Sequence, residues 1–397
     1  MRAIATMSIN KLMFAAATIA IAVFVTPRTQ GQTFSVAHSF AGSDGSGPLA
    51  GLVIDAQGRL YGTASGGGKY GAGVVFEALG ANERVLYNFG NGTSDGANPQ
   101  GRLVMDKTGN LYGTTFAGGI PNAGTVFKLV KGVETVLYSF GGSTDGANPE
   151  AGLAIDSKGN LYGTTTAGGA SGEGTVFEIS NTGHHTILYS FGGANDGTVP
   201  VSGVTLDTKG NLYGSTSTGG SYGFGTVFKL TRTQSGWKET ILHNFQMLTD
   251  GGTPYGGLIF DPKGNLYGTV TDGGVLGSDG GGTIFELTPS GNSWTFSVIY
   301  GLPGWNISGP FRDLLFDTAS GVIYGTTHCD GAYNAGTVWM LTPSAGTWNY
   351  TELYTFTGGT DGLYSFSNLV MDKSGNLYGT TNLGGANGEG VIFKVTP

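Results

Sequence analysis

The side chains best suited to bind or transform a ligand gather in one stretch about three quarters of the way along the chain. Arg312 and Asp313 end a loop that also carries Trp305, and a second loop soon afterwards carries His328 and Asp330. An aromatic plane beside charged side chains is typical of a site for a sugar or another small polar ligand. These five residues are therefore candidate ligand-binding residues.

Catalytic templates fit this stretch poorly. Cys329 follows His328 directly, and adjacent residues of an extended chain point apart, so the two do not form a nucleophile and its base. The sequence has no zinc motif, and its glycine-rich loops lack the following helix that a phosphate cradle needs. We therefore predict no catalytic residue and no cofactor. The alternative is that this repeat has changed in sequence without gaining a function, which explains the same residues. Asp330 in particular can replace a turn glycine, because Asp tolerates positive φ.

A second candidate set is acidic. Six aspartates, each followed by glycine, recur along the chain at Asp44, Asp95, Asp145, Asp196, Asp250 and Asp361. Hard cations need several oxygen ligands together, so a face built from these loops is a candidate Ca²⁺ site. The alternative is six ordinary Asp-Gly turns, because no single loop has the dense carboxylate spacing of an EF-hand.

The elements that position these residues follow from a repeat. The phrase Leu/Ile-Tyr-Gly-Thr/Ser occurs seven times, 50 to 57 residues apart, at Tyr61, Tyr112, Tyr162, Tyr213, Tyr267, Tyr324 and Tyr378. Each repeat holds about four short strand patterns, and none has a helical period of apolar residues. Such repeats are typical of β-propeller blades. The sequence thus predicts an all-β, seven-bladed β-propeller of four-stranded antiparallel blades, as one domain over residues 33–397.

One repeat shows the order of the strands. Residues 153–156, 160–165 and 174–179 read as strands a, b and c of a blade, and the tyrosine-bearing run that follows reads as strand d. In such a meander the d–a and b–c loops share one face of the ring, and the a–b and c–d turns share the other. All the candidate residues fall on the first face. Arg102 and Asn368 are further candidates there, because they replace glycine at the start of strand a, near the mouth of the central channel.

Other recurrent residues have structural explanations. The aspartate that opens each a–b turn is predicted to accept backbone N–H groups of its own turn. The glycine after each tyrosine is predicted to let neighbouring blades approach closely. One aromatic residue per repeat on strand c is predicted to fill the core between blades; these residues are Phe76, Phe127, Phe177, Phe228, Phe285, Trp339 and Phe393.

The start of the chain supplies a missing strand. Strand d repeats Tyr-x-Phe, and the segment 34–40 carries His38 and Phe40 in the same two slots. This segment has no a, b or c strand before it, whereas the last repeat stops after strand c, at Val395. Residues 34–40 are therefore predicted to be the outer strand of the final blade, which closes the ring. The same slots make His38 and His243 strand residues rather than ligands.

Residues 1–31 have the pattern of an export signal. Arg2 and Lys11 precede an apolar run over 12–25, which is short for a membrane span; an uncleaved anchor is the alternative. Without this segment 16 basic and 27 acidic residues remain, because three of the 19 basic residues are lost, and the net charge is −11. Basic residues do not cluster, so nucleic acid is not an expected partner. We expect a secreted or periplasmic monomer with no membrane span in the mature chain.

The phrases GNLYGTTFAGGIPNAGTVFKL (109–129) and GNLYGTTTAGGASGEGTVFEI (159–179) resemble GloVer-type tandem-repeat proteins, over about residues 33–397. The resemblance implies an exported bacterial repeat protein, of a group found with a choice of surface anchors and with no agreed activity, and it brings no catalytic residues. This chain stops at Pro397 without a sorting signal, which favours free secretion or periplasmic residence. The element Asp-x-x-Gly-Asn-Leu-Tyr also resembles blades of gluconolactonase-like and NHL propellers, which is a likeness of architecture.

These observations predict an exported β-propeller that acts as a binding or scaffold protein for a glycan, a small polar ligand or another surface protein. The alternative is a propeller enzyme, such as a lactonase, lyase or glycan-active hydrolase, that uses the face with the d–a and b–c loops. A third hypothesis is adhesion through Trp237, Trp294 and Trp348 in the longer c–d turns of the opposite face; otherwise these residues cover the apolar edges between blades.

Overall fold

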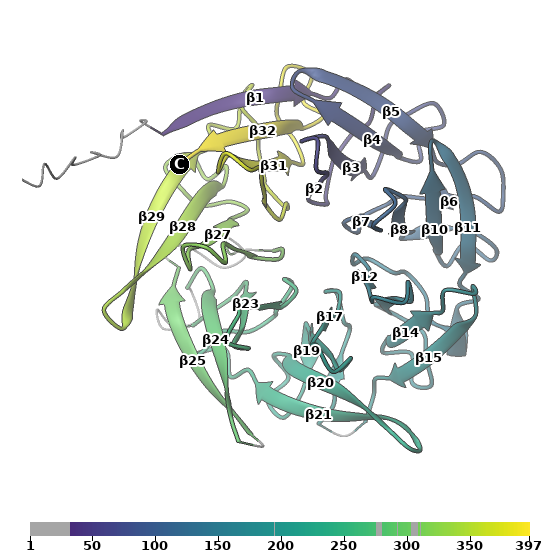
Figure 1. The fold of residues 1–397 in the computed structure, drawn as a ribbon, viewed down its shortest axis with the longest axis vertical. Coiled ribbons are helices and arrows are strands. Elements are labelled where there is room, and N and C mark those ends of the chain that lie inside the picture. Colours follow the sequence, from purple (N-terminus) through teal and green to yellow (C-terminus); the bar gives the residue numbers. More distant parts are fainter. Residues whose placement is uncertain (1–31, 194, 275–279, 292, 303–308, 310) are drawn as a thin grey trace, which may run out of the picture. The chain divides into compact units, whose positions relative to one another are not determined.

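Seven four-stranded antiparallel sheets are arranged as blades around a common axis (Figure 1). The computed structural model describes residues 32–397 except 194, 275–279, 292, 303–308 and 310. The predicted export signal and candidate Trp305 lie outside the described residues. The predicted all-β, seven-bladed propeller is confirmed, and the helical content of the described residues is the 3-10 helix η1 (Ser143–Asp145).

The short inner strands and long outer strands repeat from blade to blade. Blades 1 to 3 are β2 (Val53–Ile54), β3 (Leu60–Ala64), β4 (Val74–Leu79), β5 (Asn82–Asn88); β7 (Val104–Met105), β8 (Leu111–Thr115), β10 (Thr125–Val130), β11 (Val133–Ser139); and β12 (Ala154–Ile155), β13 (Leu161–Thr165), β14 (Thr175–Ile179), β15 (His185–Ser190). Blades 4 to 6 are β17 (Thr205–Leu206), β18 (Leu212–Thr216), β20 (Thr226–Thr233), β21 (Gly236–Asn244); β22 (Ile259–Phe260), β23 (Leu266–Val270), β24 (Thr283–Ser290), β25 (Ser293–Gly301); and β26 (Leu315–Phe316), β27 (Ile323–Thr326), β28 (Thr337–Ser344), β29 (Thr347–Thr355). Blade 7 is β30 (Val370–Met371), β31 (Leu377–Thr381), β32 (Val391–Thr396) and β1 (Thr33–Ser39); two small ladders pair β6 (Gly96–Ala97) with β9 (Ala117–Gly118) and β16 (Gly197–Thr198) with β19 (Thr218–Gly219).

Strand β1 closes the ring as predicted. It pairs antiparallel with β32, from Thr33 opposite Thr396 to Ser39 opposite Val391. The register between β1 and β32 shifts by one residue next to Phe393, the aromatic residue of strand c. In each of the other six blades the outer strand has the same one-residue shift next to its strand-c aromatic residue. Such a bulge adds local twist to an outer strand. The seventh blade therefore reproduces the other six, although its strands come from both ends of the chain.

The recurrent phrase Leu-Tyr-Gly-Thr joins each blade to its own turn and to the next blade. In blade 3, Leu161 is buried in the core, and the Tyr162 hydroxyl donates to Asp156 at 3.2 Å. The Thr164 hydroxyl donates at 2.8 Å to the carbonyl of Ser202, which precedes the first strand of blade 4. Equivalent bonds to the next blade leave Thr63, Thr114, Ser215, Thr326 and Thr380. The last of these crosses from blade 7 to blade 1, so the same bond also links the two blades where the ring closes.

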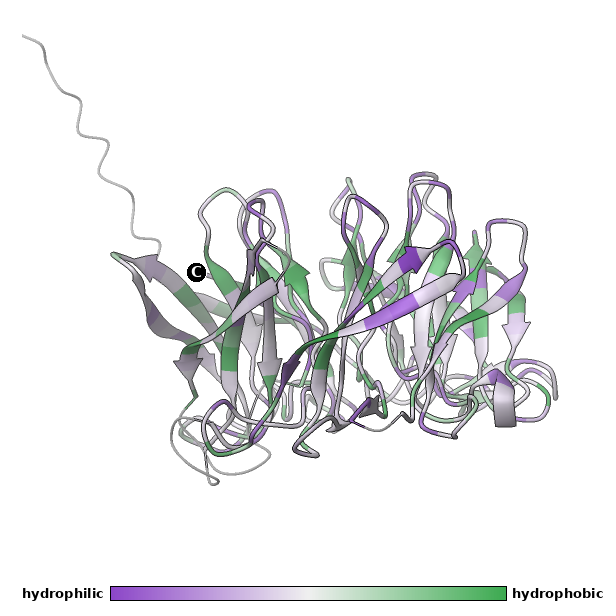
Figure 2. Cartoon of the chain, turned by 90° about the horizontal axis from the view of Figure 1, so that it is seen from below, coloured by the Kyte–Doolittle hydropathy of each residue, from purple (hydrophilic) through white to green (hydrophobic). Residues whose placement is uncertain are grey.

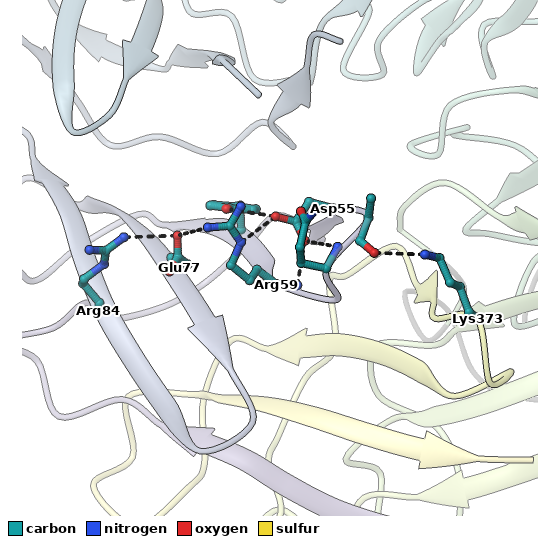
Figure 3. A network of polar contacts seen from close by, with 8 residues as sticks. Asp55, Arg59, Glu77, Arg84 and Lys373 are labelled. Carbon is teal, nitrogen blue, oxygen red and sulfur yellow. Dashed lines mark hydrogen bonds and ion pairs between the residues drawn. The ribbon is translucent and has the colours of Figure 1, made fainter. Parts of the chain in front are cut away.

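The a–b turn of blade 1 shows the role of the turn aspartate (Figure 3). Asp55 accepts the backbone N–H groups of Gln57 and Arg59, each at 2.9 Å, which confirms the predicted turn. The Arg59 side chain donates to Asp55 at 2.6 Å, and Arg84 donates to the neighbouring Glu77 at 3.2 Å. Burial by itself would raise the pKa of Asp55, but the hydrogen bonds from Arg59 and Gln57 lower it below its ordinary value.

The glycine after each tyrosine serves a different purpose from the predicted one. A Cβ on Gly163 would lie 2.5 Å from Cζ of Phe177 and 2.8 Å from Cδ2 of Leu153, and both side chains belong to the same blade. Gly163 pairs directly with Phe177 across the sheet, so the missing side chain makes room for the ring. The same contact recurs at Gly62, Gly113, Gly214, Gly268, Gly325 and Gly379. The prediction that this glycine brings neighbouring blades together is therefore wrong.

The core lies between the blades. Seven clusters of buried side chains each combine residues of two adjacent blades, and the strand-c aromatic residues in them are fully buried, as predicted. The side view of Figure 2 shows the loops gathered at two opposite faces of the ring. Trp294 and Trp348 pack against Tyr213 and Tyr267 of the preceding blade, with ring centroids 5.8 and 6.2 Å apart, and Trp237 packs on the cluster between blades 3 and 4. This packing supports the role of covering the apolar edges.

The outer strands of adjacent blades meet at a second recurrent contact, which we call the outer seam. At four seams, aromatic or histidine rings from the two blades stack; the pairs are Tyr138 with His185, His243 with Phe296, Tyr300 with Tyr350, and Tyr354 with Phe34. At the other three seams the second blade has Glu83, Glu134 or Glu239 instead, and each of these has a buried Oε1 without a hydrogen-bond partner among the described residues. A carboxyl in such a place is favoured in its neutral form.

Because of these seam glutamates, we expect the free energy of unfolding to decrease as pH rises. Burial, with a smaller contribution from Asp95, raises the pKa of Glu134 to about 7, and burial with Asp196 raises the pKa of Glu239 to about 8. Between the ordinary pKa of glutamate and these values the folded protein binds more protons than the unfolded chain, so the free energy of unfolding decreases with rising pH. We expect a loss of about 1–3 kcal/mol per carboxyl between pH 5 and pH 8.5. Urea unfolding at the two pH values measures it.

The double variant Glu134→Gln, Glu239→Gln provides the control. Glutamine resembles the protonated carboxyl, so variant and wild type should unfold at similar urea concentrations at pH 5, whereas the variant should be the more stable at pH 8.5. Equal pH dependence in the two proteins would contradict the assignment.

Candidate functional site

A cavity of about 730 Å³ occupies the axis of the ring. The first strands of the blades line it, and most of its wall is glycine or apolar; its apolar side chains include Ile54, Val104, Ile155, Leu206, Phe260, Phe316 and Met371. Arg102, Asp313 and Asn368, the three predicted polar replacements at the start of strand a, all line this cavity. The structure therefore brings together candidates that are more than 200 residues apart in the sequence.

Two of these candidates face each other across the axis. Arg102 belongs to blade 2 and Asp313 to blade 6, and their Nη2 and Oδ2 atoms are 4.0 Å apart. The side chains are 44% and 34% exposed, so the pair is open to a ligand. The other carboxylate oxygen of Asp313 accepts the backbone N–H of Gly257 at 2.7 Å. A Cβ on Gly257 would lie 2.7 Å from this oxygen, so glycine at this position lets Asp313 approach.

A second pair crosses the axis beside the first. Nη2 of Arg312 in blade 6 lies 3.9 Å from Oε1 of Glu150, which precedes the first strand of blade 3. Arg312 is largely buried, and its Nε has no hydrogen-bond partner among the described residues. Tyr255 also lines the cavity; burial raises the pKa of its hydroxyl, and the nearby carboxylate of Glu150 raises it further. The sequence analysis did not include Glu150 or Tyr255.

Asn368 completes the polar part of the wall from blade 7. Its side chain is almost fully buried, and a Cβ on Gly51 would lie 1.9 Å from its Oδ1. The amide therefore occupies space that Gly51 of blade 1 leaves open. Arg102, Arg312, Asp313 and Asn368 line the cavity, and Glu150 lies next to Arg312. Donors and acceptors beside a wall that is mostly glycine and apolar side chains suit a polyhydroxylated molecule with an apolar ring face.

His328 and Asp330 are placed elsewhere. His328 packs among aromatic rings, with centroid distances of 5.2 Å to Phe311, 4.5 Å to Tyr364 and 4.2 Å to Phe366, and it does not line the axial cavity. The carboxyl of Asp330 accepts the hydroxyl of Thr327, and burial raises its pKa to about 6. Asp330 is not among the described residues with positive φ, so it does not copy the backbone of the glycine that it replaces.

The six loop aspartates each serve their own blade. Every one accepts a hydrogen bond from the ring of the outer-strand tyrosine or histidine and another from a backbone N–H of its loop. The tyrosine hydroxyl or histidine Nε2 lies 2.7 to 3.1 Å from the carboxylate oxygen; these residues are, in chain order, His38, Tyr87, Tyr138, Tyr189, His243 and Tyr354. The backbone donors are Ala41, Asn91, Gly141, Gly192, Gln246 and Thr357, at 2.6 to 3.0 Å. These contacts agree with turn roles, and Ca²⁺ binding by this series remains a prediction.

The fold and the axial site define a seven-bladed β-propeller repeat protein. The chain belongs to the Gloeobacter/Verrucomicrobia repeat family, which matches residues 21–220 and 201–397, so the resemblance seen in the sequence is confirmed. A search of curated proteins finds no match. Among the described residues, no helix is long and apolar enough to cross a membrane.

Solved structures of other propellers share the fold. The chain is 11% identical to the extracellular domain of a protein assigned as a one-component system of B. thetaiotaomicron, with a TM-score of 0.56 over 90% of this chain. It covers 39% of that protein's chain. It is 14% identical to a protein of Bacteroides uniformis assigned as a 6-phosphogluconolactonase, with a TM-score of 0.51 over 83% of this chain and 88% of the other. At such identities the likeness shows the fold alone.

Proposed function

We propose that this protein is an exported binding protein whose axial cavity holds a small, polyhydroxylated ligand such as a mono- or oligosaccharide. The observation that carries the proposal is the crossing of two arginine–carboxylate pairs at the cavity, Arg102 with Asp313 and Arg312 with Glu150. Both pairs join opposite sides of the ring, so one ligand there contacts several blades at once.

The separations in these pairs favour an inserted ligand. Their nitrogen–oxygen distances of 4.0 and 3.9 Å exceed the 2.7–3.2 Å of a direct hydrogen bond. A hydroxyl group can bridge such a gap, because it donates to the carboxylate and accepts from the guanidinium. The apolar side chains of the wall then cover the C–H face of a sugar ring.

A propeller enzyme acting at the same cavity is the second candidate. The convergence of Arg102, Asp313, Arg312 and Glu150 favours it, since polar groups of several blades meet where a reacting molecule would lie. One of the structures that share the fold is assigned as a 6-phosphogluconolactonase, which makes sugar lactones the first substrates to try. Turnover of any lactone, abolished by Asp313→Asn, would decide for this alternative.

Ligand binding is tested with a thermal-shift panel of neutral sugars, uronic acids and aldonolactones. A ligand at 100 times its Kd should stabilise the folded protein by about 2.7 kcal/mol, which raises the melting temperature by a few degrees. Arg102→Gln should remove the shift, whereas Lys107→Gln, on an exposed a–b turn of the same blade, should retain it. A shift that persists in Arg102→Gln and in Asp313→Asn would place the ligand elsewhere.

Export and a monomeric state are part of the proposal and are supported by the sequence of residues 1–31 and by a ring that closes on itself. Cell fractionation of the full chain and light scattering of the purified protein test them. Retention in the cytoplasm would contradict export, and a concentration-independent dimer would contradict the monomer.

A further inference from the structure

We infer a binding site for a divalent transition-metal ion at the outer seam between blades 7 and 1, formed by His38, Asp44 and Glu83. His38 lies on β1, Asp44 in the loop that follows it, and Glu83 on β5 of blade 1. One ligand atom from each of the three residues lies within 4.8 Å of the others, and within the described residues this is the one group of three such side chains that satisfies this spacing.

The distances fit a coordination sphere. Nε2 of His38 and Oδ2 of Asp44 are 3.0 Å apart. Two ligands of a tetrahedral zinc ion, each about 2.0–2.1 Å from the metal, are about 3.3 Å apart. The proton that Nε2 of His38 shares with Asp44 would move to Nδ1 or to solvent as the ion binds. Small side-chain movements would then bring the three donors to bonding distance. One imidazole nitrogen and two carboxylates are a donor set for ions such as Zn²⁺, Co²⁺ or Mn²⁺, and the remaining positions would be filled by water.

The surroundings hold the carboxylates in place. Oδ1 of Asp44 accepts the backbone N–H of Ala41 at 2.8 Å, so this second contact fixes the carboxylate while Oδ2 faces His38. Oε1 of Glu83 is buried and has no hydrogen-bond partner among the described residues. His38 and Asp44 are 17% and 22% exposed, so the group remains accessible to an ion from solution. Two carboxyl groups beside an imidazole are less costly to hold together when a cation lies between them.

Comparison with the other seams shows what is special about this one. At the seam of blades 1 and 2 the corresponding residues are Tyr87, Asp95 and Glu134, which lack the imidazole. At the seam of blades 4 and 5 they are His243, Asp250 and Phe296, which lack the second carboxylate. The complete set occurs where the ring closes. A bound ion would connect the N-terminal strand to blade 1 and thus add a link across the closing contact.

The test is a titration of the metal-free full chain with Co²⁺ and with Zn²⁺, read by cobalt absorption, calorimetry and thermal melting. We expect one ion per chain and a melting temperature that rises with Zn²⁺. His38→Tyr installs the residue found at most other seams and preserves a partner for Asp44, so it should fold normally and bind the ion at least tenfold more weakly; Glu83→Gln should do the same.

Phe296→Glu provides a gain-of-binding control, because it adds the missing carboxylate beside His243 and Asp250 and should raise the stoichiometry from one ion to two. Circular dichroism of each variant checks its fold. Absence of Co²⁺ and Zn²⁺ binding by the wild-type chain up to millimolar concentration would overturn the inference, as would wild-type affinity in both His38→Tyr and Glu83→Gln. The site is independent of the axial cavity, so Arg102→Gln should bind the metal ion as the wild type does.

Discussion

A chain that begins at Phe40, and so lacks strand β1, should fail to form a stable closed ring. The deletion removes the partner of β32 from Val391 to Thr396 and leaves that strand as an open edge. It also removes Phe34, which stacks on Tyr354 at 3.7 Å and packs against the cluster between blades 6 and 7. We expect a loss comparable to the whole stability of a domain, about 5–15 kcal/mol. Near-ultraviolet circular dichroism, size-exclusion chromatography and thermal melting measure it.

The matched control is a chain that begins at Gln32 and retains β1, which should melt as one cooperative unit. A synthetic peptide of residues 32–41, added to the truncated chain, should restore part of the near-ultraviolet signal because it can occupy the vacated edge of β32. A truncated chain that stays monomeric and melts within a few degrees of the control would show that the ring is held by the other seams alone.

Gly163→Ala should be among the most destabilising single substitutions. The new methyl group would lie 2.5 Å from Phe177 and 2.8 Å from Leu153, and Phe177 is fully buried, so neither neighbour can move into solvent. Overpacking of a core commonly costs about 1–3 kcal/mol, and the closeness of these contacts leads us to expect about 3 kcal/mol or more. Urea unfolding at constant pH measures the change in the free energy of unfolding.

Gly359→Ala is the matched control, because the nearest atom to its new methyl group would be Oγ1 of Thr357 at 3.5 Å and the residue is exposed. It should change stability by about 0.5 kcal/mol or less. Replacing Phe177 with leucine in the Gly163→Ala background should recover part of the loss, since the two positions share one space. Purely additive effects of the two substitutions would contradict the proposed clash.

The repeat made the architecture predictable. Seven copies of one phrase, and a Phe40 slot that matched strand d, sufficed to place residues 34–40 beside the last blade; the structure differs only in the ends of that strand, Thr33–Ser39. The role of Gly163 was mistaken, because alternation along one strand does not reveal which neighbour fills the space above a glycine. That space is occupied by a cross-strand ring in the same sheet.

The site was predictable only in part. Arg102, Asp313 and Asn368 share one register position at the start of strand a, so a regular ring is enough to bring them to its axis. The partnership of Arg312 with Glu150 depends on the width of the channel and on loop conformation, which the repeat does not encode. His328 was adjacent to the site in sequence order but turns toward aromatic rings of blade 7 instead.

The proposed metal-binding site could not be predicted from the sequence for a similar reason. His38 and Asp44 are close in the sequence, and their pairing follows the Tyr–Asp pattern of the other blades. Glu83 joins them because it lies near the start of β5 and His38 near the end of β1, and the sequence period does not show that these two strand ends meet. Its buried oxygen, which has no hydrogen-bond partner among the described residues, is a property of the folded ring alone.

The pairing of β1 with β32 also sets an order of events during biosynthesis. β1 leaves the ribosome first and β32 last, although the two belong to one sheet. The first strand therefore stays without its partner while all the intervening blades are being translated, and the ring becomes complete only after β32 has been made. A premature stop codon in the final repeat would thus leave two unsatisfied edges, one at each end of the nascent product.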